Sequence, residues 1–283
     1  MRGARLVTLG GLVRLVHPFP ILLDGLATLA FAFIAGAVPA TAVRLGLAML
    51  CLQASIGVLN DLFDAPRDAC SKPGKPIPAG LVSPAVARVV FVAAAGTGLV
   101  LATPSGPWLV ALGGLVLSVG YAYDLFAKGT VWSWLPFAIG IPLLPVFGWY
   151  GATGSVPAPF AILLPAAVAA GAALAIANAR ADMERDGQAG LISIAIRLGS
   201  RRAWAVGAVL LVMVAVVALG SLWLAAAPEV ALGASLGAAL LLVAGLALGR
   251  SSSARRRERA WEIQAIAVAA LGAAWVWGIG RPG

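Results

Sequence analysis

The sequence is short of charged residues, cysteine and histidine, and these shortages narrow the class of protein. Charged side chains make up 11% of the 283 residues, whereas soluble domains contain about 25%, so a soluble domain is excluded. The two cysteines, Cys51 and Cys70, are too few for a disulfide framework and indicate no redox function. The alternating pattern of outer-membrane barrels is also missing. The one histidine, His17, lies at a predicted loop edge just ahead of a Pro-Phe-Pro segment.

Long apolar runs rich in Ala, Leu, Val and Gly dominate the chain instead. Hydrophobic residues make up 61% of it, and the mean hydropathy is +0.98. About 20 such residues in a helix cross roughly 30 Å of hydrocarbon, and without barrel alternation only helices satisfy the backbone there. We therefore expect an all-α polytopic membrane protein with one domain over residues 1–283, because no linker divides the chain. The nine expected spans are roughly 18–37, 41–60, 84–103, 107–124, 133–151, 158–178, 202–222, 229–248 and 260–279.

The basic residues predict how the chain is oriented. If the N-terminus is cytoplasmic, 18 of the 20 Lys and Arg residues, including Arg2 and Arg5, fall in cytoplasmic segments, and Arg44 and Arg281 fall outside. Such a skew is typical of inner-membrane proteins. The net charge of +9 is therefore explained without a nucleic-acid partner. The basic run 255–259 is interpreted as an orientation signal and a patch for anionic lipid.

A hydrophobic segment leads directly into an acidic cluster with one asparagine and three aspartates, and cations follow. Close carboxylates repel one another unless a cation binds them, and Mg²⁺ carrying phosphate is a usual partner for oxygen ligands. Pro66 is expected to end or kink the helix, so that Asp68 projects from a short loop. The cluster and its cations are Asn60, Asp61, Asp64, Arg67, Asp68, Lys72 and Lys75.

A second acidic cluster follows the sixth span and has the same composition. Asn178, Asp182 and Asp186 are four residues apart and share one face if the helix continues past the membrane. Glu184 points elsewhere and is expected to be solvated. Two such clusters, both at cytoplasmic ends of spans and accompanied by cations such as Arg185, point to a diphosphate held by metal ions.

Three motifs in order carry a resemblance to a known family. Asn60-Asp61-x-x-Asp64-x-x-x-Asp68 with Lys75-Pro76-Ile77-Pro78-Ala79-Gly80 resembles the first signature of the UbiA family of intramembrane prenyltransferases. Asp182-x-x-x-Asp186 with residues 191–199 resembles the second, and Tyr121-x-x-Asp124-x-x-x-Lys128 resembles the family's Tyr/Lys loop motif. Lys75 stands where the family commonly has Arg, so the charge is kept but the planar fork is lost.

The resemblance implies nine transmembrane helices around a central cavity, in which a prenyl group passes from an allylic polyprenyl diphosphate to a small aromatic acceptor. Pyrophosphate is released with the help of two Mg²⁺ ions, and no protein partner is required. The implied catalytic residues are Asp61, Asp64, Asp68, Asp182, Asp186 and Lys128. The metal ligands are these five aspartates with Asn60 and Asn178. The diphosphate-binding residues are Asn60, Arg67, Lys72, Lys75, Tyr121, Lys128, Asn178 and Arg185.

Three further polar residues are candidates for the acceptor pocket, and each has an alternative. His17 suits an interface position, Asp24 suits a hydrogen bond between helices, and Asp124 suits an ion pair with Lys128. The acceptor itself stays open between a hydroxybenzoate or naphthoate, a glycerol phosphate, a sugar phosphate and a porphyrin.

Two other functions share some of these features. A terpene cyclase of the same family needs the same diphosphate site but no acceptor. A secondary transporter would carry its charges near mid-membrane on broken helices, whereas these charges lie at cytoplasmic ends.

Overall fold

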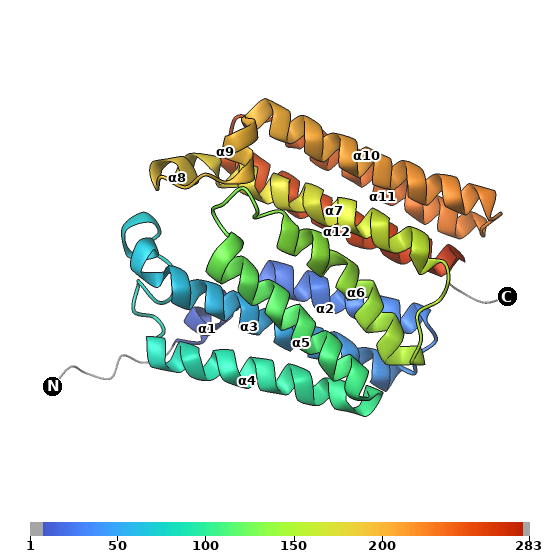
Figure 1. Cartoon of the computed structure of the whole chain (residues 1–283), viewed down its shortest axis with the longest axis horizontal. Coiled ribbons are helices and arrows are strands. Elements are labelled where there is room, and N and C mark those ends of the chain that lie inside the picture. The colour runs from blue at the N-terminus through green and yellow to red at the C-terminus, as the bar shows by residue number, and fades with distance from the viewer. Residues whose placement is uncertain (1–7, 280–283) are drawn as a thin grey trace.

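The computed structural model of the chain describes residues 8–279, and within that range every regular element is helical (Figure 1). The N-terminal half contains α1 (Leu9–Leu15), α2 (Pro18–Ile34), α3 (Pro39–Ser71), α4 (Pro84–Ala102), the short η1 (Thr103–Ser105), α5 (Pro107–Ala122) and the π-helical η2 (Tyr123–Ala127). The C-terminal half contains α6 (Leu135–Thr153), α7 (Phe160–Ala181), α8 (Met183–Gln188), α9 (Ile194–Leu198), α10 (Ser200–Leu224), α11 (Glu229–Leu248) and α12 (Ala254–Ile279).

The nine expected spans all appear as helices in the described part of the chain. Eight are long and apolar enough to cross a membrane, and the ninth, α2, qualifies together with α1, from which it is bent by 64°. The all-helical prediction is therefore confirmed. Arg2, Arg5 and Arg281, which entered the orientation argument, lie outside the described residues.

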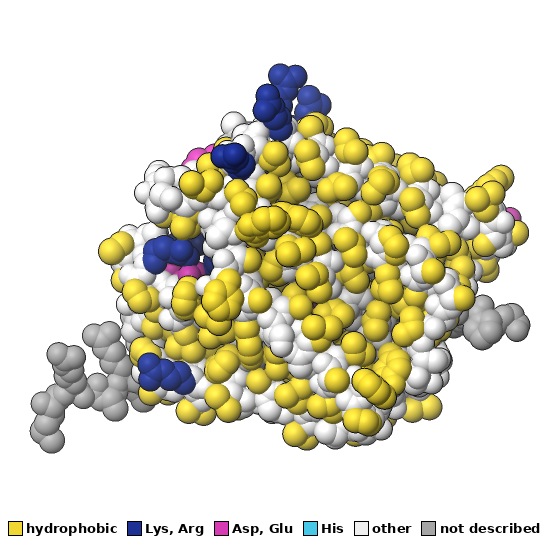
Figure 2. All heavy atoms as spheres, viewed as in Figure 1, with side chains coloured by type: hydrophobic (Ala, Val, Ile, Leu, Met, Phe, Trp, Pro, Cys, Tyr) yellow, Lys and Arg dark blue, Asp and Glu magenta, His cyan; other side chains and the backbone are white. Residues whose placement is uncertain are grey.

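The long helices run side by side across the molecule; α1 lies at the same end of it as α8 and α9, on the side of α3 (Figure 1). Helix α3 packs along α2 and α4, and α7 packs against α6, α10 and α12. Hydrophobic side chains cover most of the face shown in Figure 2, and most of its charged side chains lie toward the end that carries α8 and α9. Large apolar residues such as Val89, Val209 and Leu240 point outward, with 68%, 68% and 63% of their surface exposed. An apolar outer surface with charge at its end is the surface that a membrane-spanning bundle requires.

Helix α3 departs from the prediction in a way that matters for the site. It continues through Pro66 to Ser71, so Asp68 lies on the helix and not on a loop. A proline inside a helix removes one hydrogen bond from the ladder. Here Lys75 forms ion pairs with both Asp61 and Asp68, which lie on the turns before and after Pro66. These ion pairs stabilise the helix where the backbone hydrogen bond is missing.

Glycine lets α6 approach its two neighbours closely. A Cβ added at Gly148 would lie 2.6 Å from the carbonyl oxygen of Thr28 on α2. A Cβ added at Gly171 on α7 would overlap the backbone of Phe137 and Ala138 on α6. Small residues at such crossings allow the van der Waals contact that holds membrane helices together.

We expect Gly171→Ala to destabilise the bundle, because the added methyl group must push α6 and α7 apart. Overpacking of this kind costs about 1–3 kcal/mol. Gly233 on α11 is the matched control, since a Cβ there meets nothing within 4 Å and Ala favours a helix over Gly by about 1 kcal/mol. Thermal unfolding in detergent should show a lower midpoint for Gly171→Ala and an equal or higher one for Gly233→Ala; equal effects would contradict the close crossing.

Candidate active site

Three aspartates on the last turns of α3 are buried at the charged end of the bundle. Asp61, Asp64 and Asp68 expose 2%, 5% and 3% of their surface. They are three and four residues apart, so one face of α3 carries all of them. Buried carboxylates need compensating cations, and the neighbouring segments supply these.

Lys75, on the segment between α3 and α4, lies between two of the carboxylates. Its Nζ donates to Asp61 Oδ1 at 2.7 Å, and Asp68 Oδ2 lies 2.9 Å from the same nitrogen. Burial alone would lower the pKa of Lys75, but its contacts with Asp61 and Asp68 outweigh burial and raise it. Arg14 on α1 holds this segment in place by donating to the carbonyl of Gly74 at 2.6 Å. The predicted Lys75 position is therefore part of the acidic cluster.

Asp64 is paired with two further cations. Arg67 donates to Asp64 Oδ1 at 2.7 Å, and Lys128 donates to Asp64 Oδ2. Lys128 follows the π-helical turn η2, in which its own amide bonds to the carbonyl of Tyr123. Such turns are uncommon and often mark functional sites. The turn connects the α5 end of the bundle to the acidic face of α3.

The same turn carries Asp124, which is buried and accepts a hydrogen bond from Asn60 Nδ2 at 2.7 Å. Tyr123 lies beside the side chain of Asn178, the first residue of the second acidic cluster. Its ring also packs edge-on against Phe137 of α6, with ring centroids 5.3 Å apart. Residues of η2 therefore contact both clusters.

The second cluster lies at the junction of α7 and α8. Helix α7 ends at Ala181, and Asp182 occupies the break with φ −96° and ψ 0°. The condition under which Asn178, Asp182 and Asp186 would share one helix face is therefore not fully met, because α7 and α8 are separate helices. Helical hydrogen bonding resumes directly after the break, because the amide of Asp186 bonds to the carbonyl of Asp182 at 2.9 Å. Asp182 pairs with Arg185, and the Ser193 hydroxyl lies beside Asp186.

The segments that carry the two clusters meet, since the amide of Ile192, beyond α8, donates to the carbonyl of Gly129, next to Lys128, at 3.2 Å. Burial raises the pKa of Asp186, and the charges of Lys72, Arg67 and Lys128 from the first half of the chain oppose the rise. Burial lowers the pKa of Lys72, and the charge of Arg185 from the second cluster lowers it further.

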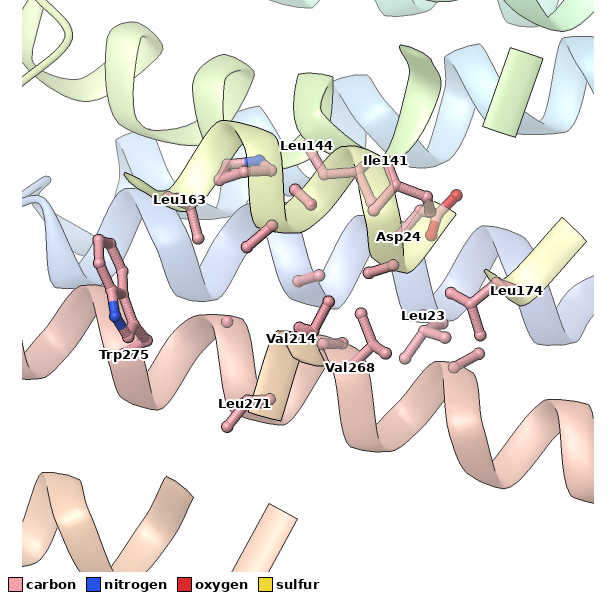
Figure 3. A pocket seen from close by; sticks show the side chains of 18 of the residues that line it. Leu23, Asp24, Ile141, Leu144, Leu163, Leu174, Val214, Val268, Leu271 and Trp275 are labelled. Carbon is pink, nitrogen blue, oxygen red and sulfur yellow. The ribbon is translucent and has the colours of Figure 1, made fainter. Parts of the chain in front are cut away.

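An elongated cavity lies inside the bundle (Figure 3). It is lined almost entirely by apolar side chains from α2, α6, α7, α10 and α12, and Asp24 is the one charged residue among the described residues that line it. Figure 3 shows Asp24 and Leu174 toward one end and Trp275 at the other. Leu174 lies one turn before Asn178, about 6 Å along α7. One end of the cavity therefore lies about one helical turn from the second acidic cluster.

Three of the expected site residues do not line the cavity and have other partners in the structure. The hydroxyl of Tyr121 is 2.7 Å from Ser55 Oγ, between α5 and α3, and does not face the acidic cluster. His17 does not line the cavity: its left-handed backbone (φ 56°) directs Nε2 to Asp61 Oδ1 at 3.0 Å. Asp124 faces Asn60 and also lies outside the cavity lining. Of the three acceptor-pocket candidates, only Asp24 lines the cavity.

The donor set of the site suits Mg²⁺, which prefers oxygen ligands. Asp61 Oδ2 and Asp124 Oδ2 are buried and accept no hydrogen bond from the described residues, so each has a free oxygen for a cation. Between residues 8 and 279, however, no three His, Cys, Asp or Glu side chains already converge on one point. The carboxylates face lysine and arginine instead, so the seven-residue metal set stays a prediction.

Sequence reasoning missed three residues of the site region. Tyr123 was passed over for Tyr121, because a π-helical turn leaves no clear mark in the sequence. Arg180 and Arg257 are buried next to the second cluster, with 5% and 4% exposed. Arg257 stands in a run of charges that otherwise faces outward, so composition alone could not distinguish it.

Curated relatives share the sequence over much of its length. A digeranylgeranylglyceryl phosphate synthase from Natronomonas pharaonis is 32% identical over 206 residues, which are 70% of this chain and 72% of that protein. The enzyme of the same name from Methanopyrus kandleri is 32% identical over 161 residues, or 56% of this chain, and the match spans only 58% of that protein's length.

Solved structures share the fold. A UbiA homologue from Aeropyrum pernix K1 superposes with a TM-score of 0.75 at 16% identity, covering 90% of this chain and 96% of that one. A homologue from Archaeoglobus fulgidus, bound to GPP and Mg²⁺, superposes with a TM-score of 0.70 at 20% identity, covering 93% and 99%. The model of the UbiA prenyltransferase family matches residues 25–271, which confirms the resemblance drawn from three motifs. The chain therefore belongs to the UbiA prenyltransferase family.

Proposed function

We propose that this protein transfers a prenyl group from an allylic prenyl diphosphate to an acceptor within the membrane and releases pyrophosphate. The observation that carries the proposal is that two acidic clusters lie at one end of the bundle, near a long apolar cavity whose lining residues Phe137 and Leu174 adjoin them. A diphosphate with a hydrocarbon tail has this same division between a highly charged head and an apolar chain.

The head would bind where cations are already gathered. Lysines and arginines that now pair with aspartates can instead donate to phosphate oxygens, because carboxylates and phosphates both accept charge-assisted hydrogen bonds from these side chains. The carboxylates so released would hold Mg²⁺, and two ions are proposed. Mg²⁺ would neutralise the negative charge that develops on the leaving pyrophosphate. The proposed ligands are Asn60, Asp61, Asp64, Asp68, Asn178, Asp182 and Asp186. The homologue bound to GPP and Mg²⁺ supports this proposal.

The prenyl chain would lie in the cavity between Asp24 and Trp275. The bond from C1 to the bridging oxygen breaks, and its electron pair leaves with pyrophosphate. A nucleophilic oxygen of the acceptor then bonds to C1 and loses its proton. Apolar walls keep water away from the allylic cation, and Trp275 is held in position by a 2.7 Å hydrogen bond from its Nε1 to Ser221 Oγ.

We propose a glycerol phosphate with a free hydroxyl as the acceptor, in place of the aromatic acceptor that the sequence analysis favoured. The support is the name shared by the two relatives, digeranylgeranylglyceryl phosphate synthase. A second phosphate also suits the cationic surroundings of Lys72 and Arg185. Asp24 would accept the hydrogen bond of the acceptor hydroxyl, because it is the charged side chain on the cavity wall. We place the site on the cytoplasmic side of the cell membrane, on the charge skew described above.

Removing either acidic cluster should stop catalysis while leaving the bundle inserted. We expect Asp64→Asn or Asp182→Asn to slow pyrophosphate release about 100-fold or more, the size of effect seen when one charge-stabilising group is lost from an active site. Glu229→Gln is the control, since this exposed carboxylate begins α11 at the other end of the bundle. Purified protein in detergent, Mg²⁺ and labelled prenyl diphosphates provide the assay; wild-type rates in both aspartate variants would refute the site.

The acceptor can be tested with the same diphosphates and a panel of a glycerol phosphate, a prenylated glycerol phosphate and hydroxybenzoate. We expect an ether product with the glycerol phosphates, and Asp24→Asn should raise the KM for that acceptor while the KM for the diphosphate stays unchanged. A prenylated benzoate would restore the aromatic prediction. A cyclic hydrocarbon formed without any acceptor would identify a terpene cyclase.

A further inference from the structure

Two buried arginines adjoin the second acidic cluster and take no part in the proposed chemistry. Arg257, near the start of α12, exposes 4% of its surface, whereas residues 255, 256, 258 and 259 on either side are exposed. Arg180, in the last turn of α7, exposes 5%. Burying a guanidinium is costly unless all its donors find partners. The partners of Arg257 therefore show which segments its side chain holds together.

The contacts of Arg257 fall on both sides of Asp182. Its Nε donates to the carbonyl of Arg180 at 2.8 Å, two residues before Asp182. One terminal nitrogen donates to Glu184, two residues after Asp182. The other donates to the carbonyl of Ser252 at 2.6 Å, which anchors the side chain to the α11–α12 connection.

Asp182 needs such support because it occupies a helix break. The last carbonyls of a helix have no partners within it, and the carbonyl of Arg180 is one of these. Arg180 also bonds to the α11–α12 connection, because its side chain donates to the carbonyl of Gly249 at 3.0 Å. The α7–α8 junction is therefore held to the start of α12 by the planar, many-donor side chain that only arginine offers.

We propose that Arg257 is a positioning residue that fixes Asp182, and with it the second acidic cluster, for binding of Mg²⁺ and diphosphate. This inference rests on the proposed function. Arg257 itself touches neither substrate nor metal; it sets the angle at which α8 leaves α7. Partners of this kind typically change metal affinity by about 10–100-fold when removed.

The test compares Arg257→Gln, Arg257→Lys and Arg256→Gln, where the last removes an exposed charge from the same turn. The first readout is the rise in melting temperature that Mg²⁺ with pyrophosphate produces, and the second is the Mg²⁺ concentration that gives half-maximal pyrophosphate release. We expect Arg257→Gln to lose most of the thermal shift and to need at least about 10-fold more Mg²⁺. Arg257→Lys should be intermediate, and Arg256→Gln should match the wild type.

Glu184→Gln provides a second route if Arg257→Gln does not fold, because this exposed side chain supplies only one of the contacts. It should weaken the response to Mg²⁺ and pyrophosphate in the same direction, by less. A lower melting temperature with an unchanged Mg²⁺ dependence in these variants would show a merely structural role and overturn the inference. A wild type that neither responds to Mg²⁺ with pyrophosphate nor releases pyrophosphate would instead refute the proposed function.

Discussion

Negative charge buried at the end of a helical bundle is the constraint on which the rest of this structure depends. Asp61, Asp64 and Asp68 lie almost entirely out of solvent, where an uncompensated carboxylate costs several kcal/mol. The compensating cations Lys75 and Lys128 come from two separate connections, so the chain must bring both connections to the end of α3. The positions of these two connections define the site, and the long helices hold both connections in place.

The same pairing explains how the site could accept a polyanion without a large movement of the backbone. The lysines and arginines are already gathered around the carboxylates, and a diphosphate with Mg²⁺ would bring charges of both signs. Under the proposed function, binding would exchange one balanced set of contacts for another by turning side chains. The free oxygen of Asp61 fits such an exchange, since its other oxygen is held by Lys75 and His17.

The polar site and the apolar cavity are joined through a small number of residues. Tyr123 lies beside Asn178 and packs on Phe137, which lines the cavity. Leu174 lines the cavity one turn from Asn178. A charged head and an apolar tail can therefore be held by adjoining walls. Since α7 contributes to both, the orientation of its end at Asp182 matters for the whole site.

The sequence by itself determined the helical class, the apolar spans and the two acidic clusters, because hydrophobic length and short spacings are local properties of the chain. It misplaced what depends on contacts between distant segments. Helix α3 continues past Pro66 with Lys75 bound to both sides of it, Tyr123 and not Tyr121 lies beside Asn178, and Arg257 is buried although its neighbours in the charged run are exposed. A membrane helix is apolar on its lipid face as well as on its packed face, so periodicity cannot say which side meets which neighbour. Only the packing of all the helices decided where each polar side chain points.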